Sequence, residues 1–327
     1  MANDRSLTYF DSRTLGKLQG VTLRVRGTVE GAVTGTHRSP FHGFAAEFAE
    51  HREYVPGDDL RYVDWKVYGR SDRVFVKQFE EETNFACHVL LDTSESMQFQ
   101  SDAASLSKLE FAKHVAAALS YVVVRQQDAV GLIAFDHMVT QIVRPGSQPA
   151  HWQQLSHVLE QTGRAGGVSP LMGPDDSTQS TTQTHQGADA PRSPFAVIGS
   201  ILSDIAEQLS RRGVVILLSD LFGNADELMK GLKRLRHRKH DVRVWQIVDP
   251  AEEDFPFDDP TLFRGLEGWA NLSVEPRLLR AAYLREFLSF RESLRRQCLD
   301  LGIDFVVLRT DLPVDLAIKQ CLTMKGL

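Results

Sequence analysis

Short apolar runs alternate with longer amphipathic segments along the chain from Phe85 onward. Residues 214–218 read Val-Val-Ile-Leu-Leu, an uninterrupted apolar strand of the kind found where helices cover both faces of a parallel sheet. Residues 106–126 instead place apolar side chains at helical spacing. The alternation predicts an α/β fold, specifically a Rossmann-like, doubly wound, mostly parallel sheet.

The same patterns give bounds for the expected elements. We expect strands at 89–91, 130–135, 139–143, 214–218, 242–248 and 305–308, and the second and third could pair across Asp136 and His137. Helices are expected at 106–126, 152–159, 195–209, 225–238, 277–301 and 313–324. Residues 261–267 and 272–275 could form a hairpin.

The chain divides into an N-terminal accessory region, residues 1–84, and a main domain, residues 85–327. The accessory region contains expected strands at 44–54 and 73–79 and many charges of both signs. These charges either pin the region to the main domain or form a partner-recognition surface with Trp65 as its anchor. Within the main domain, residues 163–194 are rich in Ser, Thr, Gln and Gly, so we expect a flexible insertion there.

Charge and cysteine usage favour a cytoplasmic protein. The 37 basic and 43 acidic residues give a net charge of −6, which argues against a dedicated nucleic-acid binder. The three cysteines have no zinc-binding spacing, as suits a reducing compartment. No secretory h-region follows the N-terminus, and the longest nearly apolar stretch, 115–124, is about half of what spans a bilayer. We therefore expect no membrane span.

Oxygen-bearing side chains follow two of the expected strands. Asp92, Ser94 and Ser96 come directly after 89–91, and Asp220 follows 214–218. The carboxyl ends of parallel strands form the ligand crevice of such sheets, and carboxylate and hydroxyl oxygens suit a hard ion such as Mg²⁺. Alternatively, Asp92 or Ser94 caps the next helix and Asp220 begins a turn.

The spacing Asp92-x-Ser94-x-Ser96, with a later Asp220, resembles the metal-ion-dependent adhesion site (MIDAS) of von Willebrand factor type A (vWA) domains. A more distinctive resemblance lies upstream and covers nearly the whole chain. The chain is similar to the bacterial domain-of-unknown-function 58 (DUF58) family. The similarity lies in the run at 50–66, Arg70, residues 76–80 and Val248-Asp249-Pro250.

The resemblance implies a metal site and a partner. Members of this family are thought to act with MoxR-type AAA+ ATPases as chaperone-like or metal-insertion adaptors. MIDAS sites usually take a further Thr from a Gly-Gly-Thr loop, whereas this chain has Gly166-Gly167-Val168-Ser169. Ser169 could substitute, a Thr of the insertion could fold back, or the position could be empty.

The function expected from these residues is a non-enzymatic, divalent-metal-dependent protein-interaction module, with Mg²⁺ or Mn²⁺ as its cofactor and a MoxR-type AAA+ ATPase as its partner. The alternative is a Mg²⁺-dependent phosphohydrolase or nuclease that uses Asp92 and Asp220. The chain carries no GxxxxGK[ST], GxGxxG, GxSxG or HExxH motif, and no catalytic residue is assigned. The acidic run at 249–259 is expected to be a solvated loop with Phe255 and Phe257 turned inward.

Overall fold

The structure, a computed structural model, describes Leu18, Leu23 and residues 47–55, 63–71, 73–80, 85–163, 197–209, 211–263 and 271–323. Ser169 and the expected insertion beyond Gly163 lie outside these residues, as does the charged run around Arg61.

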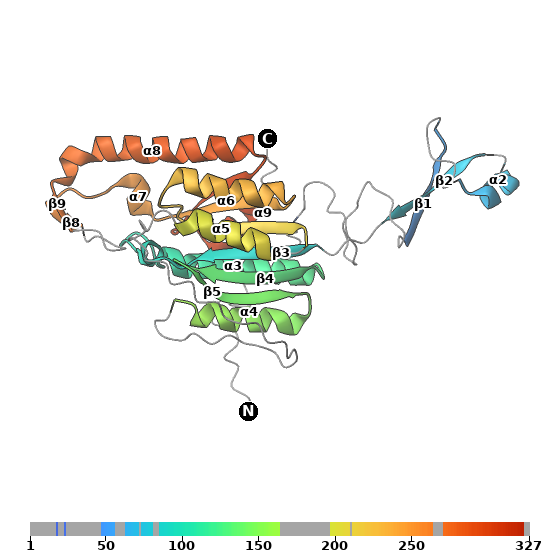
Figure 1. The fold of residues 1–327 in the computed structure, drawn as a ribbon, viewed down its shortest axis with the longest axis horizontal. Helices are drawn as coiled ribbons and strands as arrows, with labels where there is room; N and C mark the ends of the chain where they lie inside the picture. Colours follow the sequence, from blue (N-terminus) through green and yellow to red (C-terminus); the bar gives the residue numbers. More distant parts are fainter. Residues whose placement is uncertain are drawn as a thin grey trace, which may run out of the picture.

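Among the described residues, six strands form one sheet, called the main sheet below (Figure 1). They are β3 (Ala86–Asp92), β4 (Ala129–Phe135), β5 (Val139–Gly146), β6 (Gly213–Ser219), β7 (Asp241–Val248) and β10 (Asp304–Arg309). Their spatial order is β10-β7-β6-β3-β4-β5, with every neighbouring pair parallel except β4 and β5. β3, the first strand of this sheet along the chain, lies in its interior, and the strand order reverses there. The doubly wound, mostly parallel sheet expected from the sequence is therefore confirmed.

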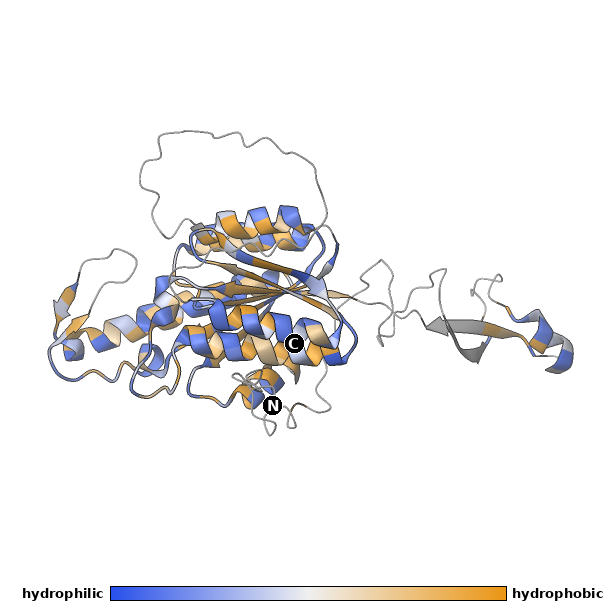
Figure 2. Cartoon of the chain, turned by 90° about the horizontal axis from the view of Figure 1, so that it is seen from below, coloured by the Kyte–Doolittle hydropathy of each residue, from blue (hydrophilic) through white to orange (hydrophobic). Residues whose placement is uncertain are grey.

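Helices cover both faces of the main sheet (Figure 2). The helices that pack against one face are α3 (Lys108–Arg125), α4 (Pro149–Gln161) and α9 (Val314–Thr323); those against the other are α5 (Val197–Gln208), α6 (Ala225–His237) and α8 (Pro276–Asp300). Because both faces are covered, all the residues of β6 and β7 are buried.

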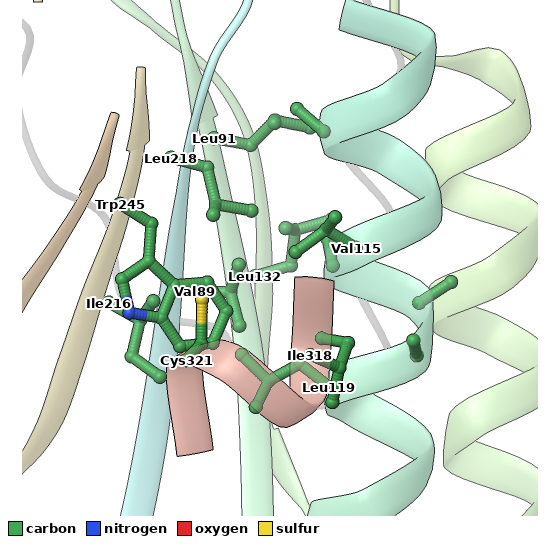
Figure 3. Close-up of a cluster of buried hydrophobic side chains, with 14 of the residues drawn as sticks. Val89, Leu91, Val115, Leu119, Leu132, Ile216, Leu218, Trp245, Ile318 and Cys321 are labelled. Carbon is green, nitrogen blue, oxygen red and sulfur yellow. The ribbon is translucent and has the colours of Figure 1, made fainter. Parts of the chain in front are cut away.

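Alternate side chains of each strand supply two separate cores. Val89 and Leu91 point into the core beneath α3 and α9, whereas Leu90 lies in the core beneath α5 and α6, because successive strand residues face opposite sides of a sheet. Figure 3 shows the first core, to which Val89, Trp245 and Ile318 all contribute. A single apolar strand therefore serves both layers of helices.

The smaller elements agree with the hairpins expected from the sequence. β4 and β5 are antiparallel neighbours joined by a short turn, and β8 (Thr261–Phe263) pairs antiparallel with β9 (Leu272–Val274). Two short helical elements lie in loops, the 3-10 helix η2 (Glu95–Gln98) and α7 (Pro250–Asp254). Figure 1 shows α8 running outside α6, with β8 and β9 near its N-terminal end.

The N-terminal part of the chain contributes in two ways. β1 (Glu47–Glu53) and β2 (Phe75–Glu80) form an antiparallel sheet of their own, with α2 (Trp65–Ser71) between them in sequence. Leu18 and Leu23, by contrast, are fully buried in the core beneath α3. The backbone of Leu23 donates to Gln126 Oε1 at 3.0 Å. Within the described residues, no helix is long and apolar enough to cross a membrane.

Candidate metal and partner-binding site

The ends of β3 and β6 lie side by side at the carboxyl edge of the main sheet. These strands are parallel neighbours, and Leu91 is in register with Leu218. Asp92 and Asp220 therefore leave the sheet at the same edge, as the expected crevice requires.

The Asp92 carboxylate is fixed on both of its oxygens. The backbone N–H of Ser94 donates to Oδ1 at 2.9 Å, and the Ser219 hydroxyl donates to Oδ2 at 2.5 Å. Ser94 occupies the N-cap position of η2 but makes no side-chain capping bond. The alternative in which the Ser94 side chain caps this helix is therefore wrong.

Ser94 and Ser96 connect Asp92 to Asp220 through the Ser94 backbone N–H and the two hydroxyl groups. The Ser94 and Ser96 hydroxyl oxygens are 3.1 Å apart, and the Ser96 hydroxyl is hydrogen-bonded to the Asp220 carboxylate. The backbone N–H of Phe222 donates to Asp220 Oδ1 at 3.0 Å. The structure thus brings together Asp92, Ser94, Ser96 and Asp220, called the carboxyl-edge cluster below. The fifth candidate, Ser169, lies outside the described residues.

Sequence reasoning missed Ser219, which contacts Asp92, and Lys108, which contacts Asp220. The Nζ of Lys108 lies 2.8 Å from Asp220 Oδ2 and 2.7 Å from Glu252 Oε1, and the lysine side chain is 2% exposed. Lys108 is the first residue of α3, where the helix dipole disfavours a cation. A lysine at that position, ahead of an apolar helix, was the available signal that carboxylates lie nearby.

The acidic run after β7 is more buried than a solvated loop. Asp249 is fully buried and caps α7 by accepting from the Ala251 backbone, while Glu252 Oε2 accepts from the Asp249 backbone. Asp249 Oδ2 also accepts from the backbone of Ser101 at 3.0 Å. Phe255 is buried as expected. The expectation was wrong for Asp249 because the capping box and Ser101 use its carboxylate.

Burial and opposite charge push the two aspartates in different directions. Burial, followed by the charge of Asp220, raises the pKa of Asp92 to about 6. Burial also acts to raise the pKa of Asp220, but the Lys108 ammonium beside it holds that pKa below its usual value. Burial raises the pKa of Glu252 even though Lys108 opposes this. The Lys108 ammonium therefore contacts two carboxylates, those of Asp220 and Glu252, and the Asp92 carboxylate lies close enough to Asp220 to feel its charge.

The residues of the carboxyl-edge cluster fit a hard divalent cation. Carboxylate and hydroxyl oxygens are the donors that Mg²⁺ prefers, and the carboxylates of Asp92, Asp220 and nearby Glu252 outnumber the Lys108 ammonium. No group of three or more His, Cys, Asp or Glu side chains in the described part of the chain could hold a metal ion. Any ion bound here would consequently depend on the Ser94 and Ser96 hydroxyls as well as on the aspartates.

Comparison with known sequences identifies one family. The sequence model of the family described as "Protein of unknown function DUF58" matches residues 50–293. Uncharacterized proteins of Mycobacterium bovis and Mycobacterium tuberculosis are 24% identical to this chain over 308 residues, which cover 92% of the chain and 86% of each relative.

The solved structures to which this chain is similar have low sequence identity to it. An aerotolerance-related membrane protein from Bacteroides fragilis is 16% identical with a TM-score of 0.38, covering 73% of this chain and 98% of that one. The conserved hypothetical protein BatB from Bacteroides thetaiotaomicron is 16% identical with a TM-score of 0.39, covering 72% and 96%. The SpRpn10 VWA domain is 11% identical with a TM-score of 0.36, covering 72% and 94%.

Proposed function

Because the chain belongs to the DUF58 family and has a vWA-like main domain, we propose that it is a non-enzymatic protein-interaction module. The carboxyl-edge cluster holds a divalent ion, Mg²⁺ or Mn²⁺, and the partner docks at this edge. The partner proposed from the family resemblance is a MoxR-type AAA+ ATPase, with which the chain acts in chaperone-like assembly or maturation in the cytoplasm.

The observation that carries the proposal is the continuous chain of contacts from Asp92 through Ser94 and Ser96 to Asp220. These four residues would hold the ion, and a bound ion would supply a positive charge able to attract a carboxylate of the partner. The protein orients the donors beforehand, because Ser219 and the Ser94 backbone fix Asp92.

Exposed apolar side chains at the same edge support protein docking there. Phe222, two residues after Asp220, is 63% exposed, and Met138, in the turn after β4, is 57% exposed. A partner segment that carries a carboxylate beside an apolar residue would use both the ion and such side chains. Aromatic anchors of this kind commonly carry much of the binding energy at interfaces.

The buried free cysteines support the proposed reducing compartment. Cys87, Cys298 and Cys321 are buried free thiols. Burial raises the pKa of Cys87 to about 12, so this thiol stays protonated and unreactive. These cysteines act as small apolar core residues, as they do in reducing compartments.

The first prediction tests the metal site. Asp92→Ala and Asp220→Ala should each abolish Mn²⁺ binding in calorimetry, because each removes a carboxylate donor. Asp226→Ala is the matched control. Asp226 is an exposed carboxylate in the first turn of α6, and like Asp220 it follows β6. Unchanged affinity in both cluster variants, with circular dichroism like that of the parent, would overturn the assignment.

Partner binding and catalysis are separated by two further measurements. Binding of the purified MoxR-type ATPase, followed by biolayer interferometry, should require Mg²⁺ and disappear in EDTA and in the Asp92 variant. Turnover of p-nitrophenyl phosphate or of a nucleic-acid substrate that is lost in Asp92→Ala would replace the proposal by the phosphohydrolase or nuclease alternative.

A further inference from the structure

We propose that Lys108 is a built-in competitor for the divalent ion at Asp220, and that Glu252 receives the Lys108 ammonium when an ion binds. The inference rests on the metal site of the proposed function and adds a residue that tunes its affinity. It starts from the position of Nζ, 2.8 Å from Asp220 Oδ2 and 2.7 Å from Glu252 Oε1.

The Lys108 side chain is packed away from solvent at the fixed first turn of α3. This side chain is 2% exposed, the Lys108 backbone N–H donates to the Phe99 carbonyl at 3.0 Å, and the Lys108 ammonium lies 5.8 Å from the Phe99 ring centroid. Ser107 caps α3 by accepting from the Glu110 backbone, which fixes the first turn. The ammonium is therefore confined to the neighbourhood of its two carboxylate partners.

Two cations cannot share Asp220 without mutual repulsion. A divalent ion held by the carboxyl-edge cluster would lie near the same carboxylate that Lys108 now contacts, in a buried setting where charges interact more strongly than in water. Binding of the ion must either bear this repulsion or shift the ammonium away from Asp220. In both cases Lys108 lowers the affinity of the site for the ion.

Glu252 is held ready as the second partner. Its Oε2 atom accepts from the Asp249 backbone at 2.9 Å, which leaves Oε1 directed at Lys108. Asp249 is itself held by Ser101 and Ala251, so the position of Glu252 does not depend on Asp220. Lys108 can consequently keep one full ion pair while it releases the other.

Lys113 offers a matched control on the same helix. It is also buried, with a 3% exposed side chain, and its Nζ lies 2.7 Å from Glu110 Oε1. Replacing either lysine by methionine removes a buried ammonium from α3 and keeps most of the side-chain volume. Of these two lysines, Lys108 contacts Asp220 and Lys113 contacts Glu110.

The experiment is a Mn²⁺ titration of the full chain by calorimetry and by the electron paramagnetic resonance signal of free Mn²⁺. Lys108→Met should bind Mn²⁺ at least about tenfold more tightly than the parent, a change of about 1.4 kcal/mol. Lys113→Met should bind like the parent. Glu252→Gln should bind more weakly, because the ammonium is then left on Asp220 alone.

A double variant keeps the test decisive if Lys108→Met unfolds. Lys108→Met with Glu252→Gln removes one charge of each sign, and it should also bind Mn²⁺ more tightly than the parent. The effect of Glu252→Gln should largely vanish in the Lys108→Met background, because it acts through Lys108.

The outcomes separate the inference from the function it rests on. Mn²⁺ binding that is lost in Asp92→Ala but is unchanged or weaker in folded Lys108→Met and in the double variant overturns the role of Lys108 alone. Absence of binding in the parent, in Lys108→Met and in the double variant overturns the metal site and the inference together. Binding that appears only once Lys108 is replaced supports both.

Discussion

Two ionisable side chains of β3 are buried with different surroundings. Asp92 is 5% exposed and is hydrogen-bonded to Ser219 and Ser94. His88, four residues earlier, is 7% exposed. Burial, followed by the charge of His240, lowers the pKa of His88 to about 4. His88 is consequently neutral in the folded protein at pH 7, and protonating it opposes folding.

The lowered pKa of His88 predicts that the folded protein loses stability in mild acid. The folded pKa of His88 lies below the unfolded value of 6.5, so its contribution is complete above pH 6.5 and is lost as the pH falls toward 4. Between pH 7.5 and 5.0, the free energy of unfolding should fall by about 2 kcal/mol more in the parent than in His88→Gln. Urea denaturation at the two pH values measures this.

The control for this prediction is His157→Gln, since the His157 side chain is 66% exposed. It should show the same pH dependence as the parent. An equal loss of stability in the parent and in His88→Gln would mean that other groups cause the acid sensitivity.

At the scale of elements, glycines set the distance between α5 and α6. A Cβ atom on Gly199 would overlap the backbone oxygen of Glu227 in α6, and one on Gly231 would lie 2.7 Å from Leu202 Cβ in α5. The two helices pack this closely because neither glycine carries a side chain. Their contact, together with Leu202 and Leu232, closes the core on that face of the main sheet.

Gly199→Ala should therefore destabilise the protein even though alanine favours helix. Overpacking of this kind typically costs about 1–3 kcal/mol, which outweighs a propensity gain of about 1 kcal/mol. Thermal denaturation followed by circular dichroism should show a lower midpoint. Gly69→Ala in α2, where a Cβ would meet nothing within 4 Å, should not lower it; a Gly199→Ala midpoint at or above the parent's would refute the close approach.

The elements themselves were largely predictable from the sequence, because apolar runs and helical spacing are local properties. The strand at 242–248 and the helix at 277–301 agree with β7 and α8 to within one residue at each end. The pairing of Asp92 with Asp220 followed from the rule for carboxyl ends of parallel strands. The ion pairs of Lys108 did not, because they join residues whose proximity depends on the order of strands and on the position of α7.

For the whole molecule, the main core extends beyond the main domain as the sequence delimited it. Leu18 and Leu23 precede β3 by more than sixty residues in the numbering, yet both are fully buried in the core beneath α3. The backbone of Leu23 is bonded in both directions to the Gln126 side chain at the end of α3. Contact of the accessory region with the main domain was one of the two alternatives expected from the sequence, but the sequence did not single out these two leucines.

Leu18→Ala and Leu23→Ala should each lower the free energy of unfolding by about 2–5 kcal/mol, the usual cost of truncating a buried leucine. Guanidinium denaturation followed by tryptophan fluorescence measures the change. Val55→Ala is the control, because Val55 is 53% exposed beside β1. A shortened chain that begins at Phe85 and is as stable as the parent would contradict the placement of both leucines.

The contacts around Lys108 also have a consequence for folding kinetics. Lys108 meets Asp220 and Glu252 across 112 and 144 residues of chain, and Ser101 meets Asp249 across 148. Contacts of such high sequence separation close late, after the loops between them have lost their entropy. A partly folded chain therefore lacks the assembled site. Binding at the site requires that β3, β6 and the segment after β7 have all reached their native positions.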